Sequence, residues 1–198
     1  MKRKTVGRVR VTSGSAGGLF LHIPRDFPSR PTQDKIKQAI FSSLGNLVGN
    51  ASRVLDLYAG VGSLGIEALS RGAAHCTFVD KHRSALNAIK QNLEHCHLQE
   101  AAEVVGSDAL RFCASEATSG EQYDLVFLDP PYAREKIQLE TFPITKYLPQ
   151  ILTSNGIIIW EHNTPNKCQD YSALECTKTT TYGSTTITLL KHKSAQIT

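Results

Sequence analysis

Apolar runs of five to seven residues recur along the chain, separated by stretches in which apolar residues repeat at helical spacing. Such runs are typical of strands buried on both faces, and the helical spacing between them indicates a parallel sheet covered by helices. Five runs are predicted to be strands of this sheet: 53–57, 75–80, 101–106, 123–128 and 156–162. Residues 174–182 and 184–191, separated by Gly183, are predicted to close the sheet as an antiparallel pair.

The segments between these strands are predicted to be helices over 63–71, 82–95 and 107–117. Residues 134–153 also favour helix, but Pro143 and Pro149 cannot lie inside one continuous helix, so a broken helix is expected there. Helices that connect parallel strands cover both faces of the sheet. The pattern therefore predicts an α/β fold with a mostly parallel, seven-stranded sheet.

The first part of the chain follows a different pattern. Residues 6–11 alternate, residues 13–18 are rich in Gly and Ser, and residues 19–23 are again apolar, which predicts a β-hairpin outside the main sheet. A helix is then expected to start near Asp34, with Thr32 as its N-cap and Phe41 towards the ligand. Its apolar stripe, which should pack on the core, is Ile36, Ala39, Ile40 and Leu44. We therefore divide the chain into a hairpin extension, residues 1–29, and a main domain, residues 30–198.

The composition is that of an ordinary globular protein. The chain has 198 residues, of which 40% are hydrophobic and 20% charged, and this length suits one domain with a substantial core. No apolar run approaches the roughly 20 residues needed to cross a bilayer, and the charged start is not a signal peptide. The five cysteines, an odd number without framework spacing, favour reduced thiols. We therefore expect a soluble, cytoplasmic protein.

Positive charge is concentrated at the start of the chain. Residues 1–37 hold nine lysines and arginines against two aspartates, a net charge of +7, which leaves −3 for the rest of a chain whose overall charge is +4. A basic segment beside a slightly acidic domain indicates a polyanionic partner, although a solvated tail would have the same composition. Nucleic acid is the favoured partner, and the residues predicted to contact it are Arg8, Arg10, Arg25, Arg30 and Lys35.

A glycine-rich turn follows the first central strand. Residues 60–65, GVGSLG, lie between this strand and a helix, where a ligand can approach the backbone and the helix N-terminus. They match the dinucleotide pattern, with Asp80 twenty residues after Gly60, so NAD is one candidate ligand. Asp56, four residues before Gly60, favours a cationic ligand instead, because a carboxylate there would repel a pyrophosphate and attract a sulfonium. This second pattern resembles the S-adenosylmethionine site of Rossmann-like methyltransferases.

A second motif, Asp129-Pro130-Pro131-Tyr132, directly follows the predicted strand 123–128. The prolines lack N–H groups and stiffen the turn, so that the preceding carbonyls can point into a site. Asp129 and a backbone carbonyl can accept both hydrogens of an NH2 group, and Tyr132 offers a flat face to an extruded base. The motif resembles the signature of amino-methyltransferases that act on the exocyclic nitrogen of a base. A proline turn with a capping aspartate and a surface tyrosine is the structural alternative.

Acidic residues are predicted at the carboxyl ends of four strands: Asp56, Asp80, Asp108 and Asp129. Rossmann-like folds bind their ligands at these ends. Asp80 is placed to accept two ribose hydroxyls, Lys81 to lie against an adenine, and Asp108 to accept from the adenine amino group. Helix capping is the alternative for each acid taken alone.

Three stretches together resemble the RsmD-type bacterial 16S ribosomal RNA guanine-N2 methyltransferases: Arg30-Pro31-Thr32 with its helix, residues 55–73, and Asp-Pro-Pro-Tyr. The likeness covers nearly the whole chain. It implies a Rossmann-like class I fold and methyl transfer from S-adenosylmethionine to the 2-amino group of one guanine in 16S rRNA. It also implies rRNA in an assembled or assembling 30S subunit as substrate. We further expect a monomeric enzyme. The implied catalytic residues are Asp129, Pro130 and Tyr132, and the implied cofactor-binding residues are Asp56, Tyr58, Ala59, Gly60, Gly62, Asp80, Lys81, Asp108, Ala109 and Asp129.

Other functions explain fewer of these features. A DNA adenine-N6 methyltransferase shares the Asp-Pro-Pro-Tyr chemistry but usually needs a larger recognition domain than 198 residues allow. An NAD-dependent oxidoreductase leaves the segment 129–132 unexplained, and a module that only binds would not need Asp129. His95-Cys96-His97 does not have the usual spacing of zinc ligands, so no metal is expected.

Overall fold

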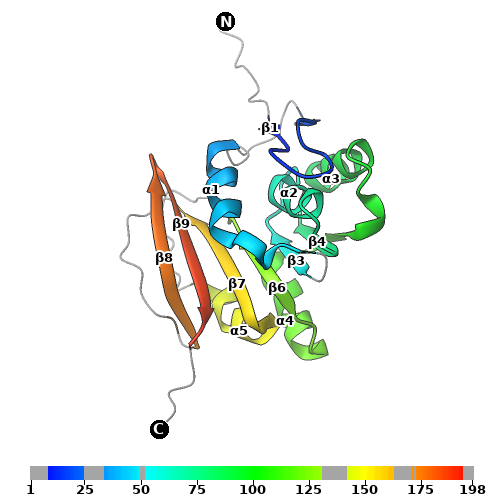
Figure 1. Ribbon diagram of the computed structural model, residues 1–198. Coiled ribbons are helices and arrows are strands. Elements are labelled where there is room, and N and C mark those ends of the chain that lie inside the picture. Colours follow the sequence, from blue (N-terminus) through cyan, green and yellow to red (C-terminus); the bar gives the residue numbers. More distant parts are fainter. Residues whose placement is uncertain are drawn as a thin grey trace, which may run out of the picture.

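Seven strands form one sheet through the middle of the fold (Figure 1). The computed structural model describes residues 9–24, 34–49, 52–130, 142–162, 171 and 173–193. Within them the strand order is β5-β4-β3-β6-β7-β9-β8, where β3 to β7 are parallel and β9 is antiparallel to both neighbours. The predicted mostly parallel sheet with a closing antiparallel pair is confirmed. Its strands are β3 (Arg53–Leu57), β4 (His75–Asp80), β5 (Ala102–Gly106), β6 (Tyr123–Leu128), β7 (Leu152–His162), β8 (Leu174–Tyr182) and β9 (Thr185–His192).

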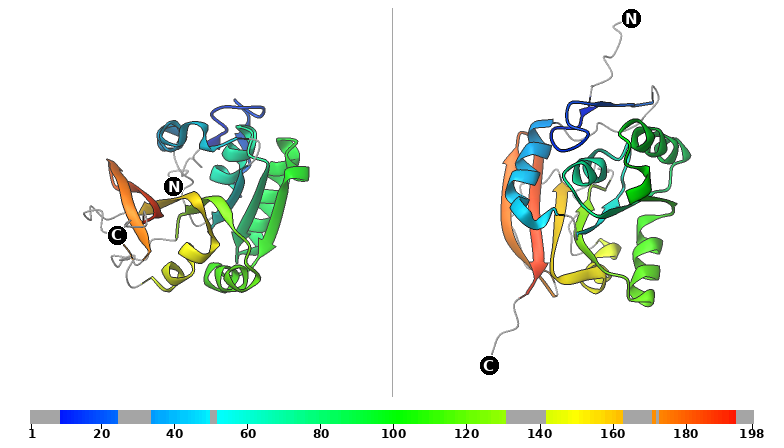
Figure 2. Two further views of the ribbon diagram at one scale, coloured as in Figure 1. Left: turned by 60° about the horizontal axis from the view of Figure 1, so that its bottom comes forward. Right: turned by 45° about the vertical axis from the view of Figure 1, so that its right-hand side comes forward.

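Helices cover both faces of this sheet (Figure 2). One hydrophobic cluster joins the sheet to α1 (Asp34–Leu44), α2 (Ser63–Ser70) and α3 (Arg83–His95). The other joins it to α4 (Ala109–Ser119), η4 (Pro143–Lys146) and α5 (Leu148–Ile151). The side chains of successive residues in a strand point to opposite faces of the sheet, so Val54 belongs to the first cluster and Leu55 to the second. This two-sided burial is why the central strands are apolar along their whole length. The described residues also form the short helices η1 (Gly45–Leu47) and η2 (Gln99–Ala101).

The region around the two prolines is broken as predicted. Pro143 and Pro149 each lie in the first turn of a short helix, η4 and α5, where a proline does not remove an intrahelical hydrogen bond. The following strand begins at Leu152 rather than at Gly156, with an irregularity in its pairing to β6. Its regular pairing runs from Ile157 to Trp160, so the apolar run marks only the regular part of β7.

The N-terminal hairpin forms a separate two-stranded sheet, in which β1 (Val9–Arg10) pairs antiparallel with β2 (Phe20–Leu21). The predicted hairpin outside the main sheet is therefore confirmed within the described residues. Its inward side chains are buried in the cluster that includes α1, α2 and α3: Val9, Val11, Ala16 and Leu21. The hairpin thus shares its core with the rest of the fold, and the division of the chain at residue 29 stays a prediction.

The turn of the hairpin is clamped to the end of α2. Ser15 N donates to the Ser70 carbonyl at 2.8 Å, and the Ser70 hydroxyl donates to the Ser13 carbonyl at 2.6 Å. Gly14 fits between them only because it has no side chain: its φ is +83°, and a Cβ would lie 1.7 Å from the Ser70 carbonyl oxygen. Two backbones meet here at a distance that no other residue allows.

A buried ionic cluster joins the hairpin to α1 and α2. The side chains of Lys37 and Glu67 are both fully buried, with Lys37 Nζ 3.5 Å from Glu67 Oε2. Glu67 also accepts hydrogen bonds from Thr12 N at 2.7 Å, the Thr12 hydroxyl at 2.6 Å and Arg71 Nε at 2.8 Å. Lys37 Nζ donates to the Arg10 carbonyl and lies 3.8 Å from Asp34. Burial lowers the pKa of Lys37, and Glu67 opposes that shift. Lys37 is therefore one basic residue of the N-terminal segment that a polyanion does not reach.

Most of α1 packs as its apolar stripe predicts. Ile36, Ile40 and Leu44 are buried. Phe41 is buried as well, with its ring centroid 5.8 Å from that of Phe127 and the Arg71 guanidinium 4.7 Å from its ring. The Phe41 ring is part of the core, so the expectation that it lies towards a ligand is wrong. Thr32, the predicted N-cap, lies outside the described residues.

We predict that Gly14→Ala lowers the free energy of unfolding by about 2 kcal/mol or more, since the new Cβ would force the turn away from Ser70. Gly18→Ala is the matched control: its φ is +92°, but no atom lies within 4 Å of the place that its Cβ would take, so only the backbone strain of about 1 kcal/mol applies. Urea denaturation of both variants tests this. Equal losses would show that the close approach to Ser70 contributes nothing.

Candidate functional site

The carboxyl ends of β3, β4, β5 and β6 meet at one edge of the sheet (Figure 1). Leu57, near the end of β3, pairs with Val79 on one side and Leu128 on the other, and Asp80 pairs with Gly106. The residues at and just after these strand ends are therefore neighbours in space. They include the candidates Tyr58, Asp80, Asp108 and Asp129.

The glycine turn between β3 and α2 is held by backbone hydrogen bonds. Ala59 N donates to the Val79 carbonyl at 3.1 Å, and Gly62 N donates to the Ala59 carbonyl at 2.7 Å. Gly62 is the N-cap of α2, and no side chain of the described residues caps this helix end. Gly65 has another role, because a Cβ there would lie 2.3 Å from the Phe78 ring. The first two glycines shape the turn, and the third lets α2 pack directly on β4, as in nucleotide-binding folds.

Asp80 connects this turn to the end of β4. Its Oδ2 accepts a hydrogen bond from Gly60 N at 3.0 Å, and its Oδ1 accepts one from His82 N at 2.8 Å. The residue is partly exposed, and Lys81 beside it is exposed. A carboxylate has about four acceptor positions. Asp80 can therefore hold the turn and still accept hydrogen bonds from a bound hydroxyl pair.

Asp108 lies at the end of β5 as the N-cap of α4. Its Oδ1 accepts hydrogen bonds from Leu110 N at 3.0 Å and Arg111 N at 3.3 Å, so helix capping is confirmed as one of its roles. The side chain remains exposed, whereas Ala109 is buried. The main chain before it is joined to β4, because Ser107 N donates to the Asp80 carbonyl at 3.2 Å.

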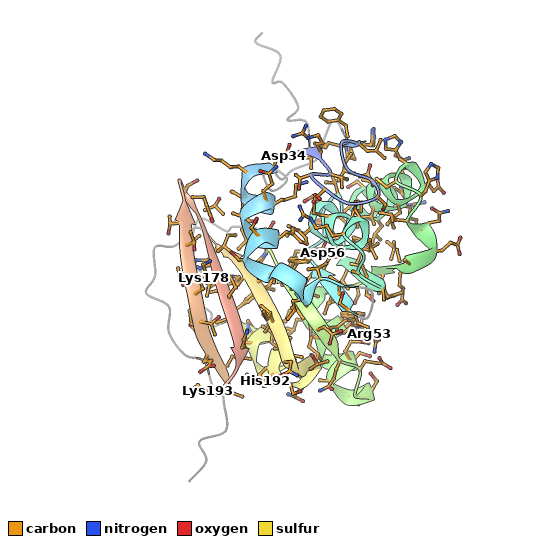
Figure 3. All side chains as sticks on the ribbon, in the orientation of Figure 1. Asp34, Arg53, Asp56, Lys178, His192 and Lys193 are labelled. Carbon is orange, nitrogen blue, oxygen red and sulfur yellow. The ribbon has the colours of Figure 1, made fainter. Side chains whose placement is uncertain are left out.

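Asp56 lies inside the fold rather than on the surface of the site (Figure 3). It is only 2% exposed, and its Oδ2 accepts a hydrogen bond from Gly65 N at 2.9 Å. Burial raises the pKa of this carboxyl to about 8, against the opposing effect of the Gly65 hydrogen bond. The group is therefore mostly protonated at neutral pH. The interpretation of Asp56 as a negative charge that selects a sulfonium is corrected accordingly, and its contact with a cofactor stays a prediction.

An aromatic pair beside this edge was only partly predicted. Tyr58 has a φ of +60°, and its ring stacks on that of Phe142, with centroids 6.3 Å apart. Burial, followed by the charge of Asp108, raises the pKa of Tyr58. Phe142 carries no signal in the sequence, since it lies inside the segment 134–153, for which the pattern predicts only a broken helix.

A second aromatic pair lies at the end of β7. Trp160 pairs with Leu128, the residue before Asp129, and its ring stacks on His162 at 4.0 Å. The Trp160 side chain is buried. Its indole N–H is buried and has no hydrogen-bond partner among the residues that the structure describes.

The second motif is described only at its start. Asp129 is partly exposed at the end of β6 and Pro130 is buried, whereas Pro131 and Tyr132 lie outside the described residues. Three of the basic candidates also lie outside the described residues: Arg8, Arg25 and Arg30. Arg10 and Lys35 are exposed, and Arg10 Nε lies 3.6 Å from Asp34, which Figure 3 shows at the start of α1.

The cysteines differ from one another. Cys76, Cys96 and Cys113 are buried free thiols, but Cys176 is disulfide-bonded, so the prediction of reduced thiols is wrong for this residue. Sequence spacing alone cannot show which sulfur atoms the fold brings together.

Within the described ranges, no three His, Cys, Asp or Glu side chains are grouped so that they could hold a metal ion. None of the helices described is both long and apolar enough to cross a membrane.

Residues 9–191 match the family described as conserved hypothetical protein 95. The chain belongs to this family. It is 38% identical over 186 residues to the putative rRNA methyltransferase YlbH of Bacillus subtilis, covering 93% of this chain and all of that protein. It is 35% identical over 128 residues to ribosomal RNA small subunit methyltransferase D of Escherichia coli, covering 65% of this chain and 62% of that protein. The predicted resemblance to the RsmD-type family is confirmed.

Solved structures of similar chains share this fold. The putative methyltransferase yhhF of Escherichia coli superposes with a TM-score of 0.79 at 27% identity, over 94% of this chain and 99% of that one. The putative methylase HI0767 of Haemophilus influenzae gives a TM-score of 0.69 at 26% identity, over 95% and 100% of the two chains. The predicted Rossmann-like methyltransferase fold is therefore confirmed.

We predict that Asp56 makes the protein less stable as the pH rises. The folded-state pKa of about 8 lies above the ordinary value of 3.8, so the folded state holds a proton that the unfolded state releases between these two values. The free energy of unfolding should therefore fall from pH 5 to pH 8 more steeply in the wild type than in Asp56→Asn, by up to about 1.4 kcal/mol per pH unit. Urea denaturation of both proteins across this range gives the comparison, and parallel curves would contradict the raised pKa.

Proposed function

We propose that this protein transfers a methyl group from S-adenosylmethionine to the exocyclic N2 of a guanine in 16S ribosomal RNA. The observation that carries the proposal is the adjacency of the glycine turn after β3 and of Asp129-Pro130 after β6, on strands that pair directly. A cofactor held at the first and an amine held at the second would meet at one edge of the sheet. The rRNA methyltransferase names of the relatives support RNA as the substrate.

The residues at this edge fit S-adenosylmethionine chemically. Asp80 is partly exposed beside the turn and offers acceptors for the two ribose hydroxyls. Asp108 is exposed and suits the adenine amino group, with Lys81, Ala109 and Tyr58 nearby along the same edge. Gly60 and Gly62 allow close approach of the cofactor to the backbone, and Ala59 shapes the turn. When bound, the cofactor supplies a methyl group already activated by its sulfonium.

The protein's part in the reaction is alignment rather than acid–base chemistry. Guanine N2 is a poor nucleophile because its lone pair is delocalised into the ring. Hydrogen bonds from N2 to the Asp129 carboxylate and the Pro130 carbonyl would favour a more pyramidal amine and aim its lone pair at the methyl group. Tyr132 would stack on the base. The proton lost from N2 after transfer leaves to solvent.

The finer parts of the proposal concern the setting of the reaction. The substrate is rRNA within an assembled or assembling 30S subunit, the enzyme acts as a monomer in the cytoplasm, and no metal takes part. The basic residues expected to contact the RNA are Arg8, Arg10, Arg25, Arg30 and Lys35, which flank or belong to the hairpin in sequence. The names of the relatives favour RNA over the DNA substrate of an adenine-N6 methyltransferase.

Transfer of radiolabelled methyl from S-adenosylmethionine tests the proposal directly. The assay offers 30S subunits, protein-free 16S rRNA and duplex DNA, and the labelled product is digested to nucleosides. We expect N2-methylguanosine from the ribosomal substrates. N6-methyladenine in DNA, or no transfer to any of the three, would contradict the proposed function.

We predict that Asp129→Ala lowers kcat by about 100-fold or more, because the alanine accepts no hydrogen bond from N2. Asp129→Asn keeps one carbonyl acceptor and should retain more activity than the alanine variant. Because Asp129 acts on the amine, the Kd for S-adenosylmethionine, measured by calorimetry, should change far less than kcat in both variants. Equal kcat in Asp129→Ala and the wild type would remove Asp129 from the mechanism.

A further inference from the structure

The buried face of α3 contains one polar side chain. Asn92 is fully buried, although the other buried residues of this helix are apolar: Ala85, Ala88, Ile89 and Leu93. A buried amide is tolerated only when its polar atoms are hydrogen-bonded, whereas an apolar side chain would fill the same position without that requirement. Core packing alone therefore does not explain an asparagine here.

The amide of Asn92 joins two segments that are distant in the sequence. Its Nδ2 donates to the Val61 carbonyl at 3.0 Å, in the glycine turn, and to the His22 carbonyl at 3.1 Å, directly after β2 of the hairpin. Its Oδ1 accepts a hydrogen bond from His22 N at 2.7 Å. Both hydrogens of the amide nitrogen are used, and only one orientation of the amide satisfies all three bonds. His22 therefore fixes the orientation in which Asn92 meets the turn.

At the turn, Asn92 holds one end of a peptide group whose other end is held by the turn itself. The Val61 carbonyl and the Gly62 N–H belong to this peptide, and Gly62 N donates to the Ala59 carbonyl at 2.7 Å. The φ values of Gly60 and Gly62 are +59° and +80°, and glycine adopts many other backbone conformations at little cost. Hydrogen bonds must therefore select the observed shape of the turn, and Asn92 supplies one of them.

We propose that Asn92 is a positioning residue of the cofactor site and couples binding of the cofactor to docking of the hairpin. When the hairpin is docked, His22 holds the amide in the orientation that fixes the Val61–Gly62 peptide. A cofactor that requires this shape of the turn binds more tightly to the docked form, and by linkage the bound cofactor stabilises the docked hairpin. This inference rests on the proposed function, because it takes S-adenosylmethionine as the ligand of the turn.

Three variants test the positioning role through the Kd for S-adenosylmethionine, measured by calorimetry. Asn92→Leu keeps the bulk without the hydrogen bonds, and Asn92→Asp places a second oxygen against the His22 and Val61 carbonyls. Leu93→Ala is the matched control, because it removes buried apolar contacts of the same helix but no hydrogen bond to the turn. We expect the Kd to rise about tenfold in both Asn92 variants and to stay near the wild-type value in Leu93→Ala. An unchanged Kd in the Asn92 variants, or an equal rise in Leu93→Ala, would overturn the positioning role.

Amide hydrogen exchange tests the coupling, which a purely structural asparagine would not affect. The hairpin amides to follow are those of Val11 and Gly18, which donate to the Leu19 and Val11 carbonyls. Saturating S-adenosylmethionine should slow their exchange about fivefold or more in the wild type and in Leu93→Ala, but not in Asn92→Leu. The same slowing in all three proteins, or in none of them, would overturn the coupling.

Exchange without the cofactor separates this inference from the proposed function. In the cofactor-free proteins, the Gly62 amide should exchange faster in Asn92→Leu than in Leu93→Ala when both rates are compared with global unfolding. Equal rates would overturn the positioning of the turn even if the wild type methylates rRNA. A wild type that does not bind S-adenosylmethionine would overturn the proposed function and the coupling to this cofactor, and the Gly62 rates would still decide whether Asn92 holds the turn.

Discussion

The buried contact between Lys37 and Glu67 is the constraint on which the arrangement of the first half of the molecule depends. Two opposite charges removed from water are tolerated only when both are paired and their remaining hydrogen-bonding groups are satisfied. Here Thr12, Arg71 and the Arg10 carbonyl complete the set. Loss of one partner would leave the other as an uncompensated buried charge, at a cost of roughly 3–5 kcal/mol. The hairpin, α1 and α2 therefore have one mutual arrangement that satisfies every group.

This arrangement matters at the opposite end of α2. Glu67 and Ser70 anchor the later part of the helix to the hairpin, and Gly65 packs its earlier part directly on β4. Gly65 N also donates a hydrogen bond to Asp56, and this bond joins the early part of α2 to β3. A helix fixed along its whole length gives its first turn a defined position at the edge of the sheet. The glycine turn can then be shaped by backbone alone, which is what a ligand in close contact with the backbone requires.

Much of the fold could be predicted from the sequence because its signals are local. The buried strands are continuous apolar runs, the two prolines interrupt a helix wherever they occur, and the glycine turn has a fixed spacing. The protonation of Asp56 could not be predicted, since a carboxyl at a strand end can be exposed or buried and only the packing of α2 decides. Lys37 and Glu67 likewise resemble surface charges on helices, and their pairing joins residues of separate helices. The contact of Phe142 with Tyr58 also joins residues that lie far apart in the sequence.

The anchoring of the hairpin has a consequence for the order in which the chain acquires its structure. The residues that anchor the hairpin lie 54 to 70 positions after the hairpin residues that they bind: Glu67, Ser70 and Asn92. A hairpin with two-residue strands is not stable by itself in water. During synthesis the segment that emerges first must therefore wait, undocked, until α2 and α3 have been made and folded. The part of the molecule that we place against RNA is made first and becomes structured only after much of the remaining chain has been synthesised.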